Sequence, residues 1–174
     1  MPSIGPISAT PDQVNTFVGP VDPMVANVAA AVAASNDAHL MIFQVKRPVT
    51  VSEVFFQVGV QSGNVDIGIF AGGKNGDSVA RLASTGSTAC PAGGSASLNL
   101  SAPLTLLPGR SYFAAIAADN TTATFRACAS SGGQMSRNAD QYITATQVVT
   151  SFPLPNPIAI GQTITSLHFC LLFQ

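Results

Sequence analysis

The sequence predicts an all-β protein, an antiparallel β-sandwich of about eight or nine short strands. From His39 onward, apolar and polar residues alternate in short runs, as they do in strands that bury one face. Clusters of Gly, Pro, Asn and Asp separate these runs and indicate tight turns. Many short strands with turn signals between them are typical of a sandwich or barrel.

Composition indicates one folded domain with an unusual surface. The chain has 174 residues, of which 47% are hydrophobic, so a large core can form without disulfides. Charged residues make up only 9%, against a typical share of about 25%. Such a surface is typical of a subunit whose faces are covered by neighbours, although a soluble domain of low charge has the same composition. The few basic residues are scattered, which excludes a nucleic-acid-binding surface.

The N-terminal residues 1–22 are expected to be an extended arm, followed by a single sandwich domain over 23–174. Four prolines in the arm fix φ and remove backbone donors, so neither a helix nor a central strand fits there. The arm would lie on its own domain or on a neighbour. The chain starts with no signal-peptide pattern and has no apolar stretch of the length needed to cross a membrane. A soluble protein made in a cytoplasm is therefore expected.

A short helix is predicted over 23–34. Asp22 could cap it, with Pro23 at the first helical position. Val25, Val28 and Val32 then recur at helical spacing.

Strands are expected wherever the period changes to two. The segments are 40–45, 50–58, 64–70, 79–85, 96–100, 112–118, 122–128 and 163–173, and the β-branched segment 142–150 is a candidate for a ninth. Residues 104–107 lead into the Pro108-Gly109 turn. Segment 163–173 is the most hydrophobic, with Leu167, Phe169, Leu171 and Phe173 on one face, and is expected at the centre of a sheet. Between 150 and 163, Pro153, Pro155 and Pro157 enforce an extended stretch.

Metal ligands are sparse in the sequence. His168 and Cys170 are two residues apart and would face the same side of a strand, but one such pair is a weak zinc signal. Asp77 with Asn75 and Ser78 could offer loop oxygens to calcium, and turn chemistry explains the same residues. Cys90, Cys128 and Cys170 are an odd number and are expected to be small buried hydrophobic residues. No metal site and no cofactor is predicted.

No catalytic residue is predicted either. Glu53 is the one glutamate, so a glycosidase pair would have to come from aspartates, and nothing in the sequence brings two of these together. The candidates are Asp66, Asp77, Asp119 and Asp140. The Gly-rich loops around Gly72, Gly93 and Gly132 lack the ending of a phosphate-binding loop. We therefore expect a protein that is not an enzyme.

Three segments between His39 and Ala127 carry a resemblance to a known family. In 42–51 an apolar strand meets Lys46-Arg47-Pro48 and then the next strand. Segment 62–70 enters a hairpin, and in 104–117 a Pro-Gly turn feeds an aromatic strand. This stretch resembles the jelly-roll-like β-sandwich domains of tailed-bacteriophage virion proteins. Carbohydrate-binding modules share the Pro-Gly-aromatic landmark, but this chain has no Trp.

The resemblance implies a structural virion protein, most of all a capsid decoration or cement protein. Such a protein associates with itself, with a trimer expected, and with the major capsid or other virion proteins. It has no nucleic-acid or membrane partner. The alternative is a tail or spike module that holds host glycan with loops at one end of the sandwich, such as 72–78, 90–95 and 130–137. A cellular carbohydrate-binding or adhesin domain is a third possibility.

Overall fold

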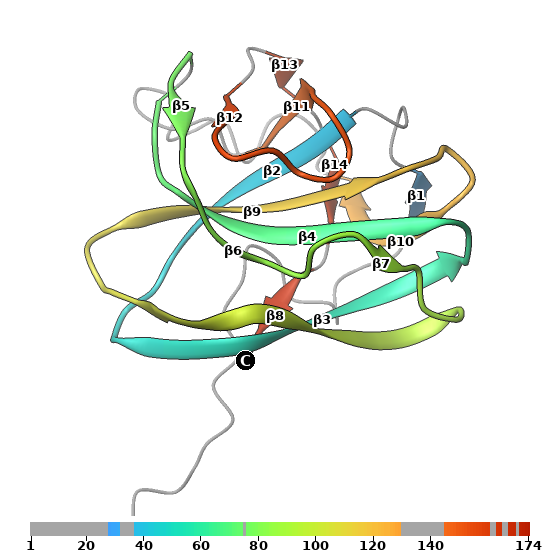
Figure 1. Ribbon diagram of the computed structural model, residues 1–174, viewed down its shortest axis with the longest axis horizontal. Helices are drawn as coiled ribbons and strands as arrows, with labels where there is room; N and C mark the ends of the chain where they lie inside the picture. The colour runs from blue at the N-terminus through green and yellow to red at the C-terminus, as the bar shows by residue number, and fades with distance from the viewer. Residues whose placement is uncertain are drawn as a thin grey trace, which may run out of the picture.

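The protein is all-β, with antiparallel sheets. The computed structural model describes residues 28–31, 37–74, 76–129, 145–160, 163–164, 167–169 and 171–174. Within these ranges the chain forms strands β1 to β15 and no helix (Figure 1). Every strand pairing between them is antiparallel.

The first of the two large sheets, here called sheet A, has six strands. Its members are β1 (Val28–Ala31), β3 (Val49–Val60), β8 (Gly94–Leu106), β10 (Thr124–Ala129), β14 (Leu167–Phe169) and β15 (Leu172–Phe173). The path runs β1-β10-β3-β15, while β14 also pairs with β10 and β8 with β3.

The second large sheet, sheet B, has seven strands. They are β2 (Asp37–Gln44), β4 (Asn64–Ala71), β6 (Arg81–Ser84), β7 (Thr88–Ala89), β9 (Ser111–Ala118), β11 (Ala145–Val149) and β13 (Thr163–Ile164). Their order is β13-β11-β2-β9-β4-β6, with β7 also on β4. A separate pair joins β5 (Ser78–Val79) to β12 (Ile158–Ala159).

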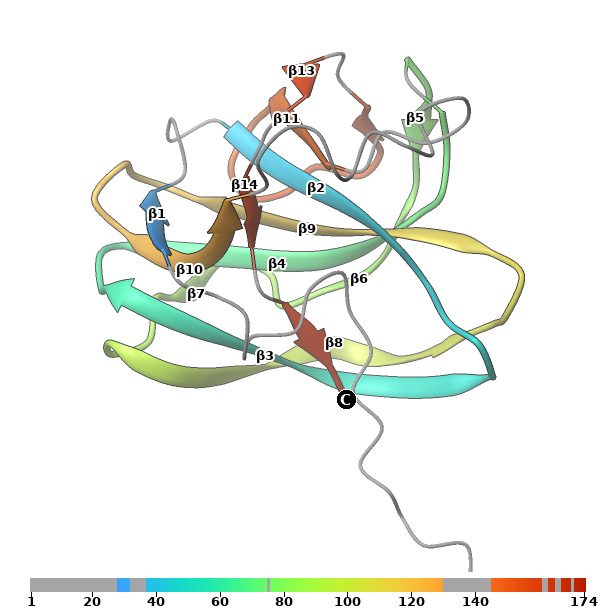
Figure 2. The same cartoon turned by 180° about the vertical axis from the view of Figure 1, so that it is seen from behind.

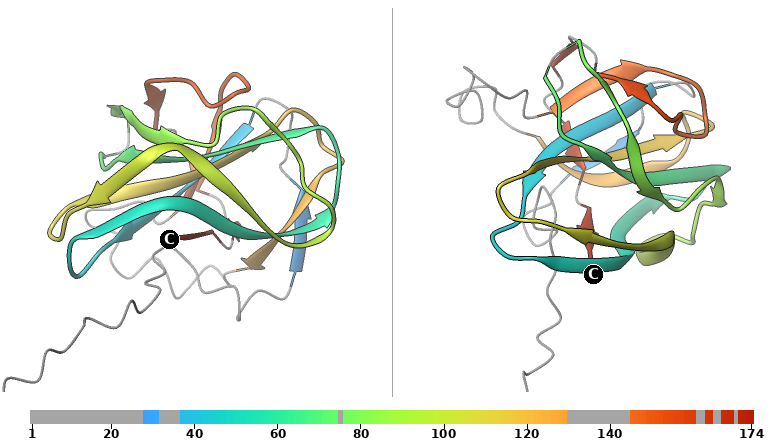
Figure 3. Two further views of the ribbon diagram at one scale, coloured as in Figure 1. Left: turned by 60° about the horizontal axis from the view of Figure 1, so that its bottom comes forward. Right: turned by 60° about the vertical axis from the view of Figure 1, so that its left-hand side comes forward.

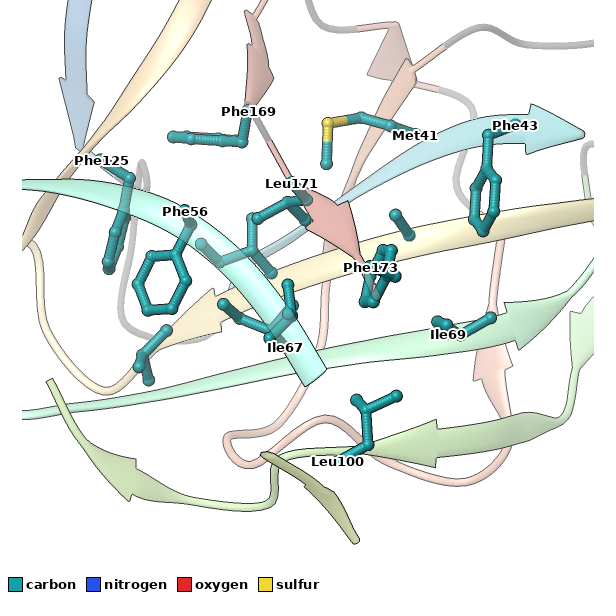
Figure 4. Close-up of a cluster of buried hydrophobic side chains, with 14 of the residues drawn as sticks. Met41, Phe43, Phe56, Ile67, Ile69, Leu100, Phe125, Phe169, Leu171 and Phe173 are labelled. Atoms are coloured by element: carbon teal, nitrogen blue, oxygen red, sulfur yellow. The ribbon is translucent and has the colours of Figure 1, made fainter. Parts of the chain in front are cut away.

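An inner core lies between the two sheets, and residues of both contribute to it. Figure 4 shows these side chains meeting from strands that are far apart in the sequence. Its larger members include Met41, Phe43, Phe56, Ile67, Ile69, Leu100, Phe125, Phe169, Leu171 and Phe173. The alternation seen in the sequence decides which residues enter: Val65, Ile67 and Ile69 of β4 all do.

A second, outer core covers the opposite face of sheet B. Sheet residues such as Leu40, Phe70 and Phe113 pack there against a covering layer. That layer contributes Val79, Leu154, Ile158 and Ile160, with Phe152 partly buried against it. Sheet B is therefore buried on both faces, which explains why the burial pattern of β4 is continuous where its sequence alternates.

The predicted helix over 23–34 is wrong for its described part, because Val28–Ala31 is strand β1. The backbone of β1 pairs with β10, from Val28 opposite Ala127 to Ala31 opposite Thr124. Alanine favours a helix and valine a strand, so the local preference of the segment is weak, and the edge of β10 supplies backbone partners that outweigh it. The rest of that segment, and the arm 1–22, lie outside the described residues.

The predicted strand 163–173 is divided among three shorter strands. β13 belongs to sheet B, whereas β14 and β15 belong to sheet A, so the chain crosses from one sheet to the other. Phe169 lies opposite Ala127 of β10, and Phe173 lies opposite Val54 of β3. The C-terminal segment thus lies where β10 and β3 separate (Figure 2). Phe169, Leu171 and Phe173 are at most 1% exposed, which confirms the expected burial.

The segments that carry the resemblance form connected strands. Residues 46–48 carry the chain from β2 in sheet B to β3 in sheet A. Pro108 and Gly109 form the turn between β8 and β9, and Gly109 has a φ of 77°, which glycine tolerates. The Tyr112 hydroxyl braces this turn by accepting a hydrogen bond of 2.8 Å from the Leu107 N–H. The turn predicted at Pro-Gly is confirmed.

Candidate functional site

Asp66 lies on the outer face of β4 and is completely buried. One of its oxygens, Oδ2, accepts a hydrogen bond of 3.0 Å from the Leu154 N–H in the covering layer. Burial raises the pKa of this carboxyl; the Leu154 hydrogen bond and the charge of Arg81 act in the opposite direction. Asp66 therefore holds the covering layer on sheet B.

Arg81 of β6 reinforces the same contact from the side. Its Nη1 donates a 2.6 Å hydrogen bond to the Leu154 carbonyl, and its backbone N–H donates to Oδ1 of Asn156 at 2.9 Å. The proline-rich segment of the covering layer is thus held at Leu154 and Asn156. We call Asp66, Arg81, Leu154 and Asn156 the layer clamp.

Asp77, the candidate calcium ligand, closes its own loop. Its Oδ2 accepts a 2.6 Å hydrogen bond from the Lys74 N–H. Its carbonyl accepts from the Ile160 N–H at 2.8 Å, which joins the loop to the covering layer. Ser78 begins β5, and Asn75 lies outside the described residues. The geometry agrees with turn chemistry at this loop.

Asp119 fixes the start of β4 to the end of β9. Its two oxygens accept hydrogen bonds of 2.9 and 2.8 Å from the backbone and side-chain amides of Asn64. Asn120 donates a third, at 2.6 Å. The hydrogen bond from the Asn64 N–H, followed by that from Asn120, lowers the pKa of Asp119. Gly63 lies so close that an added Cβ would be 2.1 Å from Oδ1 of Asp119.

The three described aspartates of the predicted candidate set are thus bonded to three different backbone amides. Asp66 serves the covering layer, Asp77 a loop and Asp119 the start of β4. The fourth, Asp140, lies outside the described residues. Glu53 sits half-buried on β3, where its backbone bonds to Gln174.

His39 is the residue that sequence reasoning missed. It is 1% exposed in the inner core, and neither ring nitrogen has a hydrogen-bond partner among the described residues. Its ring meets Phe169 edge-on at 5.0 Å between centroids. Burial lowers the pKa of His39 to about 4, although the nearby Asp37 acts to raise it. The signal was present, since His39 shares its strand face with Met41 and Phe43.

The structure brings together no metal-binding group in the part of the chain that it describes. No set of three or more His, Cys, Asp or Glu side chains gathers there. His168 lies opposite Cys128 in the β14–β10 pairing, and Cys170 is outside the described residues. Cys90 is free and buried, as predicted for that cysteine.

Two of the three loops expected to form one glycan-binding end, 72–78 and 90–95, lie at opposite ends of β4. Loop 72–78 follows the C-terminal end of β4, whereas Cys90 donates its N–H to Gly63, just before the N-terminal end of the same strand. Eight residues of β4 separate the two, about 26 Å at the usual rise per residue. The third loop, 130–137, lies outside the described residues.

Fold and side-chain contacts define an all-β protein of antiparallel sheets, in which the buried Asp66 joins the covering layer to sheet B. No known family model matches the chain, and no curated protein is significantly similar to it. Among the described residues there is no helix long and apolar enough to cross a membrane.

Proposed function

We propose that this chain is a structural protein of a tailed-bacteriophage particle, a capsid decoration or cement subunit built as a jelly-roll-like β-sandwich. One observation carries the proposal: Asp66, Asp77 and Asp119 each accept a backbone hydrogen bond that fixes the covering layer, a loop or the start of β4. Such side-chain hydrogen bonds between distant segments stiffen the block. The sparse charge of the chain suits faces that meet other proteins.

In this proposal the sandwich caps a junction between shell subunits, and the arm 1–22 lies across a neighbour. Such contacts exist only in the assembled shell, so they stabilise it by mass action and leave free subunits unaffected. Self-association would add contacts at each junction, because every copy presents the same surface.

The separation of loops 72–78 and 90–95 along β4 weighs against the alternative of a glycan-binding tail or spike module. A single loop cluster at one end of the sandwich is what that alternative needs.

Electron microscopy with gold-labelled antibody against the purified chain tests the proposal on phage particles from the source culture. Label over the heads is expected. Label confined to tail tips would support the receptor-binding module, and particles without label would contradict both. Heads that lack the chain should rupture more readily, and adding back the purified full chain should restore them.

A further inference from the structure

Strand β8 forms one edge of sheet A among the described residues. β8 runs over the residues Gly94–Leu106, and β3 is the one described strand that pairs with it (Figure 3). Its second row of backbone N–H and C=O groups therefore has no ladder partner in the described part of the chain. An edge of this kind is a template for another strand.

In the N-terminal half of β8 the usual devices that block such an edge are missing. No charged side chain occurs anywhere in residues 82–109. Nearer the C-terminal end, Pro103 removes one donor and the register with β3 shifts between Asn99 and Leu104, so the regular stretch of β8 is 94–99. Natural edge strands commonly carry lysine or an inward-pointing charge to prevent pairing.

The edge of sheet B at β6, in contrast, is protected against pairing with another strand. β6 has four residues, starts with Arg81, and has its first N–H bonded to the side chain of Asn156. β6 lies next to β8 without pairing with it. Leu82 of β6 and Leu107, which follows β8, are 41% and 40% exposed, so apolar surface flanks the free edge.

We infer that two copies of this chain pair through β8, antiparallel about a two-fold axis, so that sheet A continues from one copy into the other. A two-fold contact places each surface against itself, so any charge on the edge would meet the same charge. A strand without charge is compatible with itself in this sense. Pairing over the regular stretch 95–99 centres the axis at Ser97, so that Ser97 of one copy lies opposite Ser97 of the other.

Such a contact closes at two copies, because each β8 has one free edge. It differs in this respect from the three-fold assembly that the virion resemblance implies. The inference rests on the self-association included in the proposed function, and it is independent of where in a particle the protein lies.

Sedimentation velocity of the full chain over a concentration series tests the inference. The wild-type chain is expected to form dimers. Ser97→Lys, at an exposed position of β8, should raise the dissociation constant at least tenfold through like-charge repulsion across the axis. The matched control is Ser52→Lys, at an exposed position of β3 in the same sheet, which should leave dimerisation within twofold.

Mixing charge variants gives a sharper readout. The Ser97→Lys and Ser97→Asp variants should each dimerise weakly alone. When they are mixed they should form a heterodimer, because opposite charges then meet across the axis. Amide hydrogens of 95–99 should exchange more slowly in the dimer than in either variant. Circular dichroism checks that the variants fold, and Asn99→Lys replaces Ser97→Lys if that variant does not.

A monomer at every concentration would overturn the inference. So would a dimer or trimer that Ser97→Lys and Asn99→Lys leave intact. Either result leaves the gold-labelling experiment to decide the virion role by itself.

Discussion

His39 shows how one buried side chain links stability to pH. The imidazole of His39 lies in the inner core, its nitrogens have no hydrogen-bond partner among the described residues, and burial lowers its pKa from 6.5 to about 4. The unfolded chain therefore binds a proton between these pH values that the folded chain does not. The contribution of His39 to stability is complete above about pH 6.5 and is lost as the pH falls toward 4.

The His39→Leu variant should remove this dependence. In the wild type, the free energy of unfolding should fall by up to about 3 kcal/mol between pH 6.5 and 4, and the variant should lose most of that slope. At pH 7.5 the variant should be at least as stable, because two unpartnered nitrogens leave the core. Urea unfolding at several pH values measures both. Parallel profiles for the two proteins would show that His39 is not the titrating group.

Gly63 is a second position where one residue is decisive. Its φ of 55° is left-handed, and an added Cβ would be 2.1 Å from Oδ1 of Asp119. Gly63→Ala should lower the free energy of unfolding by about 2–4 kcal/mol, since the Asn64–Asp119 hydrogen bonds must shift.

Gly86 provides the control for Gly63. It has a similar φ of 67°, but nothing lies within 4 Å of an added Cβ. Gly86→Ala should therefore show the backbone strain alone, about 1 kcal/mol. Thermal unfolding of both variants measures the difference, and equal losses would exclude the clash with Asp119.

At the scale of elements, the layer clamp decides whether the covering layer stays on sheet B. Asp66→Ala leaves the buried Leu154 N–H without its acceptor, which should destabilise the protein by about 1–3 kcal/mol. The amide hydrogen of Leu154 should then exchange faster. Asp66→Asn keeps an oxygen acceptor and should lose less. Unchanged exchange at Leu154 in Asp66→Ala would mean that the outer core holds the layer unaided.

At the scale of the whole molecule, the C-terminal segment and the N-terminal arm should behave in opposite ways. Deleting 167–174 removes Phe169, Leu171 and Phe173 from the inner core. Each such loss costs about 3–5 kcal/mol for a phenylalanine, and a whole domain is stable by about 5–15 kcal/mol. That truncated chain should not fold, as circular dichroism and amide dispersion in NMR spectra would show.

Deleting 1–22 instead should leave the melting temperature nearly unchanged and weaken association with particles. Thermal melts and co-sedimentation with phage heads measure the two effects. If the chain without 1–22 fails to fold, the arm belongs to the core and its proposed role across a neighbour is wrong.

The sequence by itself determined the all-β class, the burial of the last apolar segment and the Pro108-Gly109 turn. These depend on local rules, namely period-two alternation and backbone geometry, which are readable from neighbours along the chain. The virion role, the trimer and the arm remain predictions.

Only the tertiary structure decided what depends on contacts between distant segments. Strand β1 replaced a helix because β10 offered its edge. The segment 163–173 was divided because it crosses between sheets, and the outer face of β4 was buried because the covering layer packs on it. The alternation within one strand does not show that a second layer, contributed from 150–160, packs on its polar face. The free energy of that burial depends on residues on both sides of the contact, which are far apart in the sequence.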